Sequence, residues 1–467
     1  MNVITDITSQ GTSQGTSQTA SHGLTRALAE QARTLSYADL PDDVRALARQ
    51  CVLDYVACTL AGAKEELADI LLAEMAEQGG APVATVIGRA ERLPVLSAAL
   101  VNGAASHALD FDDVNLAMTG HPTVVLLSAL LALAEERSSP GVDVITAFVA
   151  GYELQCRLGL LLAPGHYNAL GFHATGTLGS FGAAAACAHL LGLDAEQFAT
   201  ALGIAGTQAA GLKSMFGTMC KPLHAGKAAY HGLLAARLAK RGFTSRADAL
   251  ECPQGFARTH SPDFNPAEAL ATPPGGFHIR NNLFKYHAAC YMTHAPIEAA
   301  RKLREQHGLT PDRIARIRLS LDETCDRVCN IPAPRTGLEA KFSLRLTTAM
   351  ALAGVDTGGL GSYSEATAAD PTLIALRDMV EFDFQNGRPN TLADLELILT
   401  DGSRVAASYD AGVPSNDVDE QGRRIEEKFT SLAEPIVGAA KTRALIGEIG
   451  RFEASPDLRG VMRLCTM

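Results

Sequence analysis

Three carboxylates and two imidazoles lie within fifteen residues of this sequence, directly before an apolar segment. They belong to residues 107–113 (HALDFDD) and to His121, and residues 124–134 are almost entirely apolar. Burying polar groups beside a core segment is costly, so this density indicates a site rather than a surface. A carboxylate beside a histidine can orient the imidazole and raise its basicity, which suits proton abstraction. The alternative is that the charges only end a helix and the histidine lies in a loop.

The same cluster could instead bind a metal through His107, Asp110, Asp112 and His121. This spacing matches no metal-ligand pattern, so we predict no metal.

Two further stretches predict anion binding. His173 precedes Thr175 and an alanine-rich segment, and backbone N–H groups with a threonine hydroxyl at a helix start bind anions. A packed capping histidine is the alternative. Lys221 directly precedes a helix predicted over residues 224–241, where its charge opposes the helix dipole, and that local cost favours a functional role. The phosphate-binding and dinucleotide-binding glycine motifs are absent from the sequence. The residues alone therefore predict an enzyme that uses His, Lys and Asp on a small anion.

The elements that must position these residues are mainly helices. Residues 1–22 are of low complexity and predicted to be disordered. Helical periodicity dominates residues 23–268 and returns in residues 412–467, so both stretches are assigned to one large all-helical domain. Residues 269–411 are predicted to form a smaller inserted α+β lid domain, with a cleft between the two domains.

The α+β character rests on strand patterns between helices. Residues 314–321 alternate apolar and polar side chains, and residues 392–399 and 404–409 flank an Asp-Gly turn, which predicts a hairpin. Helices are predicted over residues 296–306 and 343–353.

Composition limits the partners. The net charge is -11 and no Lys/Arg-rich run occurs, which argues against a nucleic-acid or anionic-membrane partner. No signal peptide or membrane-spanning stretch is predicted. The ten cysteines include no C-x-x-C pair and are predicted to be reduced, so we expect a cytoplasmic protein.

Several motifs, in the same order, resemble the MmgE/PrpD family from about residue 25 to 455. They are His107-Ala-Leu-Asp110-Phe-Asp-Asp113 with His121-Pro-Thr, Gly171-Phe-His173, Lys221-Pro-Leu-His224-Ala-Gly, and Phe284-Lys285-Tyr286-His287-Ala-Ala-Cys290 with His294. The resemblance implies a helical domain with an inserted lid, a homodimer, and a small polycarboxylate substrate handled without metal or organic cofactor. It also places Asp110, His121, His173, Lys221 and Lys285 on active-site positions, with Lys285 on the lid.

The family includes 2-methylcitrate dehydratases, cis-aconitate decarboxylases and iminodisuccinate epimerases, and this sequence departs from the lyase pattern. Val114 replaces a threonine, Cys290 replaces a histidine, and Leu346 stands where a tyrosine is frequent. We therefore expect a cofactor-independent epimerase of an iminodisuccinate-like amino-polycarboxylate, with a dehydratase or decarboxylase as the alternative. The expected catalytic residues are His121 and Lys221 as proton-transfer groups and Asp110 as the group that orients His121. His173, Lys285 and Arg345 are expected to hold substrate carboxylates.

Overall fold

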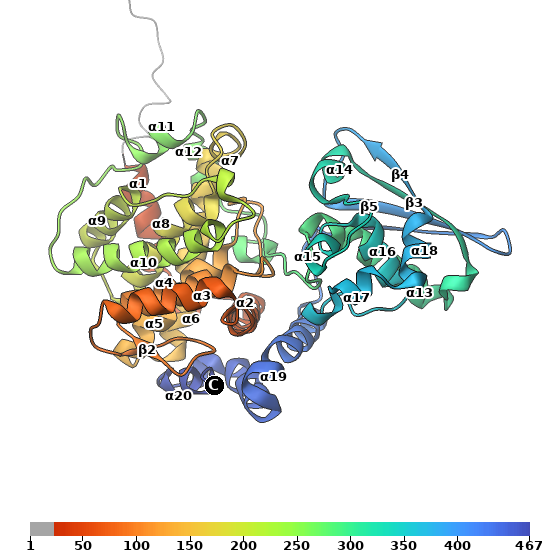
Figure 1. Cartoon of the computed structure of the whole chain (residues 1–467). Helices are drawn as coiled ribbons and strands as arrows, with labels where there is room; N and C mark the ends of the chain where they lie inside the picture. The colour runs from red at the N-terminus through yellow and green to blue at the C-terminus, as the bar shows by residue number, and fades with distance from the viewer. Residues whose placement is uncertain (1–22) are drawn as a thin grey trace, which may run out of the picture.

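The computed structural model describes residues 23–467, so the prediction of disorder for residues 1–22 lies outside the described residues. Helices predominate and the strands form small sheets, which confirms a mainly α fold with a smaller α+β part. Figure 1 shows a helical body and a smaller body that carries the larger sheet, with the long helix α19 running along the base between them.

The bounds of the elements are as follows. The helical body contains α1 (Leu24–Thr34), α2 (Asp42–Gly62), α3 (Glu66–Glu77), β1 (Ala84–Thr85), β2 (Arg92–Leu93), α4 (Val95–His107), α5 (Pro122–Arg137), α6 (Gly141–Leu162), α7 (Gly165–Asn168), α8 (Ala174–Leu190), α9 (Ala195–Gly206), α10 (Cys220–Lys240), α11 (Phe256–His260) and α12 (Pro266–Leu270). The second body contains α13 (His294–His307), β3 (Ile314–Asp322), α14 (Glu323–Cys329), α15 (Gly337–Ala340), α16 (Leu344–Leu352), α17 (Glu365–Ala368), α18 (Pro371–Asp378), β4 (Val380–Gln385), β5 (Leu392–Leu399) and β6 (Arg404–Asp410), and α19 (Val418–Gly450) and α20 (Arg459–Leu464) follow.

A close contact between α4 and α10 brings the candidate site residues of both helices together. A Cβ atom on Gly103 of α4 would lie 2.7 Å from the Cα of Gly226 on α10, so only glycine allows this contact. Helix α4 ends at His107 and α10 begins at Cys220. The glycine contact therefore brings the Asp-rich turn after α4 next to the first turn of α10.

Helix α6 is the one helix of the described residues long and apolar enough to span a membrane, by length and composition alone. Within its most apolar stretch, 83% of the residues are buried inside the protein. This burial fits a core helix, packed against α8 and α5.

The lid sheet has four strands in the order β4-β3-β5-β6. β5 and β6 form the antiparallel hairpin that the Asp401-Gly402 turn predicts, and β3 matches the predicted strand. β4 was not predicted; it adds at the edge, parallel to β3, with Ile317 opposite Val380. The helices predicted in this region correspond to α13 and α16.

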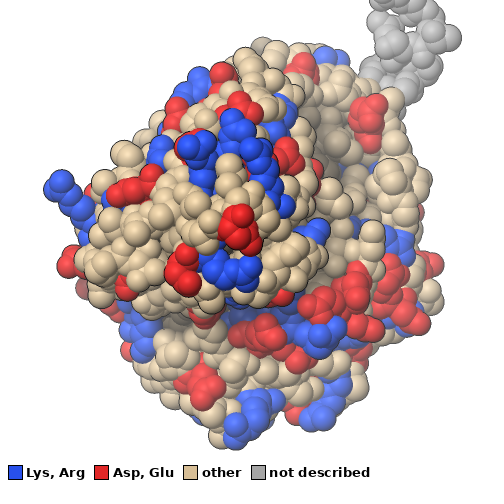
Figure 2. Space-filling model, turned by 90° about the vertical axis from the view of Figure 1, so that its right-hand side faces the viewer, with Lys and Arg blue, Asp and Glu red and all other residues tan. Residues whose placement is uncertain are grey.

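The buried apolar residues form two groups. The larger includes most of the helical body, part of α19 and a few residues of the second body such as Leu346 and Leu373, and the smaller lies between Ala295 and Leu399. The exact domain boundaries stay a prediction. On the face shown in Figure 2, acidic and basic side chains are intermixed.

Candidate active site

The turn after α4 holds Asp110 in an unusual backbone conformation. Asp110 has a φ of 51°, in the left-handed region that costs an ordinary residue roughly 1 kcal/mol. Two cations bind carbonyl groups of this turn: the Lys285 ammonium donates to the Asp110 carbonyl, and Lys428 Nζ donates to the Phe111 carbonyl at 2.6 Å. These bonds come from segments far apart in the sequence, so the tertiary structure maintains the turn.

Three basic side chains converge on the Asp110 carboxylate. Its Oδ1 lies 2.6 Å from Lys221 Nζ, 3.3 Å from Lys285 Nζ and 3.4 Å from His121 Nε2. Burial alone would raise the pKa of Asp110, but the Lys221 and Lys285 charges outweigh it and hold the pKa well below its usual range. The carboxylate is therefore ionised at neutral pH. Its side chain is 46% exposed, while that of Lys285 is 2% exposed, so Asp110 marks the open side of the cluster.

Asp112 binds two imidazoles from the buried side. Both of its carboxylate oxygens lie 3.0 Å from His107 Nδ1, and Oδ2 lies 2.9 Å from His121 Nδ1. Burial would raise the pKa of Asp112, but the two histidines outweigh burial and hold it well below its usual range. The sequence analysis assigned the orientation of His121 to Asp110. The geometry assigns it to Asp112, because Asp112 faces Nδ1 and leaves Nε2 directed toward the open side.

His107 is neutral at physiological pH. Burial lowers its pKa to about 4, although the neighbouring Asp112 opposes the shift. The neutral ring then carries its proton on Nδ1 and donates it to Asp112, and Nε2 has no hydrogen-bond partner among residues 23–467. His107 therefore supports Asp112, which in turn supports His121.

His173 lies directly before α8. Its Nδ1 is 3.0 Å from His224 Nδ1, and its ring stacks on His107 at a centroid distance of 5.8 Å. Burial, followed by the nearby His107 and Lys221, holds its pKa well below the usual range. His173 can therefore offer a neutral hydrogen-bonding group beside the cluster. The Thr175 hydroxyl accepts from the His121 backbone N–H at 3.0 Å and links α8 to His121.

Lys221 does not precede its helix as predicted, because α10 begins at Cys220. Its ammonium thus lies in the first helical turn, where the dipole is unfavourable for a cation. The ion pair with Asp110 compensates for this cost. The side chain is 14% exposed, which leaves it accessible to a small ligand.

The segment that carries Lys285 is fixed to the Asp-rich turn by the backbone. Val114 and Leu283 exchange two N–H···O bonds of 2.9 Å each. Lys285 follows two residues later, so its position depends on this bridge. Val114 contributes backbone groups here and has no hydroxyl to offer a substrate.

Arg345 is not part of the cluster, which corrects its prediction as a carboxylate clamp. Its guanidinium donates to the Val380 carbonyl at 2.5 Å and lies over the Phe382 ring at 4.5 Å. Ser343 caps the start of α16, and Leu344 and Leu346 on either side of Arg345 are buried. The Arg345 side chain therefore points toward β4. The arginine thus supports the lid sheet.

Four side chains of the cluster meet the distance requirement for a metal site. Donor atoms of His107, Asp110, Asp112 and His121 lie within 4.8 Å of one another. The ammonium of Lys221 lies 2.6 Å from one oxygen of the Asp110 carboxylate, and the ammonium of Lys285 lies 3.3 Å from the same oxygen. This positive charge opposes a divalent cation, so the prediction of no metal stays our expectation.

Some members of this cluster were not predicted to act on the substrate. His107 and Asp112 were considered only as metal ligands, because their contacts with His121 form only when the turn is folded. Asp54 and Lys428, a buried ion pair of 2.6 Å behind the turn, were missed. Lys428 belongs to a helix rich in charged residues, so the sequence pattern does not show that this one lysine is buried.

Family models match nearly the whole described chain. The MmgE/PrpD N-terminal domain matches residues 26–269, and the MmgE/PrpD C-terminal domain matches residues 287–449. The chain belongs to the MmgE/PrpD family. The second match begins two residues after Lys285, so the cluster of this MmgE/PrpD protein lies almost entirely in the part matched by the N-terminal domain.

Several curated proteins are similar to this MmgE/PrpD chain. Cis-aconitate decarboxylase of Homo sapiens is 29% identical over 455 residues, which are 93% of this chain and 92% of the relative. The Mus musculus protein of the same name is 27% identical over 463 residues, 94% and 93% of the two chains. That of Aspergillus terreus is 31% identical over 314 residues, only 64% of each chain.

Proposed function

We propose that this protein is a lyase that decarboxylates cis-aconitate or a closely related unsaturated tricarboxylate. The observation that carries the proposal is the convergence of two ammonium groups and one imidazole on a half-exposed carboxylate, all within 3.4 Å. The names of the similar proteins support a decarboxylase over the epimerase that the sequence analysis favoured.

The two lysines would hold the substrate. Lys221 and Lys285 carry two positive charges, of which Asp110 compensates one. A substrate carboxylate that approaches from the exposed side of Asp110 meets the remaining charge in a partly buried site, where electrostatic attraction is stronger than in water. The same charge stabilises the electron pair that develops beside a carboxylate during the reaction.

Decarboxylation needs one proton and no redox partner. The bond to the leaving carboxylate breaks and releases carbon dioxide, and its electron pair forms a new carbon–carbon double bond. The electrons of the original double bond take a proton at the far carbon, which gives a methylene-succinate. We assign this proton to His121 Nε2, because Asp112 at Nδ1 stabilises the imidazolium that donates it.

Epimerisation of an iminodisuccinate-like substrate is the second candidate. It needs one group to remove the α-proton and another to return one from the opposite face. His121 Nε2 and Lys221 Nζ both lie close to Asp110 Oδ1, at 3.4 Å and 2.6 Å, and could serve as this pair. The replacement of a threonine hydroxyl by Val114 also favours this candidate over a lyase.

Proton NMR in D2O separates the candidates. The protein is incubated in separate tubes with cis-aconitate, 2-methylcitrate and iminodisuccinate. Decarboxylation gives new methylene-alkene signals and one deuterium in the product's saturated methylene group. Exchange of the α-proton of iminodisuccinate with interconversion of stereoisomers would instead establish the epimerase, and new alkene signals from 2-methylcitrate would indicate a dehydratase.

A matched pair of variants connects the activity to the cluster. Lys221→Met removes a site ammonium, and Lys227→Met removes an exposed lysine from the same helix. We expect at least a hundredfold loss of turnover for the first and full activity for the second. Equal activity of both variants would refute the role of Lys221.

Two expectations concern the whole protein. The family resemblance implies a homodimer, which light scattering on purified protein checks, and the cysteine pattern predicts a cytoplasmic location, which cell fractionation checks. A monomer at assay concentrations would refute the first.

A further inference from the structure

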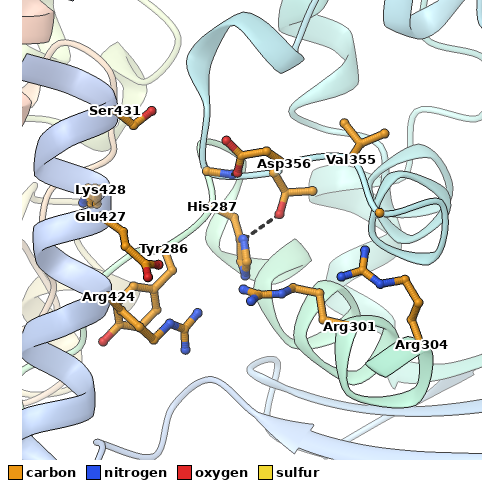
Figure 3. A pocket seen from close by; sticks show the side chains of 13 residues that line it. Tyr286, His287, Arg301, Arg304, Val355, Asp356, Arg424, Glu427, Lys428 and Ser431 are labelled. Atoms are coloured by element: carbon orange, nitrogen blue, oxygen red, sulfur yellow. Dashed lines mark hydrogen bonds between the residues drawn. The ribbon is translucent and has the colours of Figure 1, made fainter. Parts of the chain in front are cut away.

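A second cluster of cations lines a cavity between the lid and α19. The cavity has a volume of about 350 Å³ and is separate from the Asp110 cluster. Its walls are α13, the loop at residues 354–358, and the face of α19 that carries Arg424 and Lys428 (Figure 3). Arg301 and Arg304 extend into this space from α13, opposite α19.

The cations of this cavity exceed its acids. Its lining includes Arg301, Arg304, Arg424 and Lys428 but only Asp356 and Glu427 as carboxylates. Lys428 is neutralised by the buried Asp54 at 2.6 Å. Asp356 is held by its own loop, where it accepts from the Gly358 N–H at 2.9 Å. Arg304 lies 3.3 Å from Glu305 and donates to the Ala351 carbonyl at 3.0 Å. The guanidinium of Arg301 is therefore the least balanced of the three.

Glu298, which lies beside the cavity, already has two partners. Glu298 lies 3.0 Å from His287 Nε2 and accepts from Arg424. Among the described residues, the ion pairs of Arg301 are long, 3.8 Å to Glu298 and 3.9 Å to Glu305. The Arg301 side chain is 38% exposed, so it has both charge and freedom to bind a ligand.

We propose that this cavity binds a small dianion, a dicarboxylate or a phosphate, between the guanidinium groups of Arg301 and Arg304 on the lid and Arg424 on α19. Guanidinium groups bind both anions through paired hydrogen bonds. The volume lies at the lower end of the range for ligand pockets, which fits a small anion. The ligand would bridge the lid to the helical body.

One covalent connection and one hydrogen bond join this cavity to the catalytic cluster. His287 of the cavity wall follows Lys285 by two residues, and its Nδ1 is hydrogen-bonded to the Thr357 hydroxyl at 2.8 Å. Lys428 of the opposite wall donates to the Phe111 carbonyl, between Asp110 and Asp112. A dianion that draws α13 toward α19 therefore acts on both segments that place the catalytic charges.

Isothermal titration calorimetry of the full chain tests the proposal with inorganic phosphate and, separately, with succinate at matched ionic strength. Arg301→Gln/Arg304→Gln removes two guanidiniums, and Lys302→Gln is the control because Lys302 is exposed on the same helix and outside the cavity. We expect at least tenfold weaker binding in the double variant and unchanged binding in the control. The single variant Arg301→Gln, whose ion pairs are long, gives the same readout with less risk to folding.

The two probes identify the source of the anion. Binding of phosphate alone points to a phosphorylated ligand, and binding of succinate alone points to a carboxylate. Both results support the site, provided that the arginine variants weaken binding and Lys221→Met does not. The absence of saturable binding of either probe would overturn the proposal. So would binding that Lys221→Met abolishes and Arg301→Gln/Arg304→Gln leaves intact, since the anion would then occupy the catalytic cluster. Turnover is not part of this readout, so the result is independent of the proposed reaction.

Discussion

Replacement of Asp113 by asparagine should stabilise the protein at alkaline pH. The side chain is fully buried, and Oδ2 accepts from the Thr123 hydroxyl at 2.5 Å. Its Oδ1 has no hydrogen-bond partner among the described residues. Burial, followed by the negative charge of Asp54, raises the pKa of Asp113 from its ordinary 3.8 to about 7. Asparagine has nearly the same shape and carries no charge at any pH.

The sign of the effect follows from the raised pKa. The folded state holds the proton more tightly than the unfolded state, so this contribution is present in full below about pH 4 and is lost as pH rises through about 7. A shift of about three pKa units corresponds to about 4 kcal/mol, of which about 1.5 kcal/mol is already lost at about pH 5. The advantage of the variant should therefore be about 2.5 kcal/mol larger at about pH 8 than at about pH 5.

Thermal melts at these two pH values measure this difference. For a chain of this length, roughly 1 kcal/mol shifts Tm by about 1 °C, so we expect a gain of about 2–3 °C at the higher pH relative to the lower. Any cost of burying the amide is equal at both pH values and cancels. Glu153, whose pKa burial also raises to about 7, is present in both proteins and cancels too.

The control variant is Asp312→Asn, an exposed aspartate of the lid. Its Tm should follow that of the parent protein at both pH values. If Asp113→Asn changed Tm equally at both, the buried carboxylate would not be protonated near neutral pH, and the reasoning about its environment would fail. We expect turnover to stay within a few-fold of the parent, since Asp113 is closed off from the substrate side.

Three further predictions concern the cluster and its surroundings. Asp112→Asn should lower turnover by about 10²–10⁴-fold with an unchanged circular dichroism spectrum, because His121 loses its orienting anion; activity within threefold of the parent would contradict this role. Dialysis against a chelator should leave turnover intact, because two ammonium groups lie beside the Asp110 carboxylate and oppose a divalent cation; a loss of turnover that zinc or magnesium restores would instead support the metal site. Arg345→Met should lower Tm while kcat and KM stay unchanged, because Arg345 supports β4; a raised KM alone would return it to the substrate.

Local sequence signals predicted most of the fold. Helical periodicity identified the elements of the helical body, and the Asp401-Gly402 turn located the hairpin of β5 and β6. The start of α10 was placed four residues too late, because Pro222 favours a helix start near that point while the helix begins at Cys220. β4 was not predicted, although its sequence VEFDFQ alternates apolar and polar side chains as a half-buried strand does.

The composition of the site was predictable, but its internal pairing was not. The motifs brought attention to Asp110, His121, His173, Lys221 and Lys285, and the structure places all five together. The pairing of carboxylates with ring nitrogens depends on the left-handed backbone at Asp110. The residue type at this position does not predict that conformation. The prediction for Arg345 was wrong because the sequence does not show toward which element a side chain of α16 points.

Two opposing requirements explain why the Asp-rich turn is held from so many sides. The turn needs carboxylates close to one another, and their mutual repulsion must be balanced in a buried setting. Lys221 and Lys285 balance Asp110, the neutral His107 donates a hydrogen bond to Asp112 beside His121, and Lys428 balances Asp54 behind them. Asp113 has no ion-pair partner among the described residues, and its carboxyl takes up a proton instead. Because Lys285 and Lys428 lie in the segments before α13 and after β6, the charge balance of the turn depends on where the body formed by α13–β6 lies. A movement of this body would therefore alter the electrostatics of Asp110, without any need for one of its own side chains to reach the substrate.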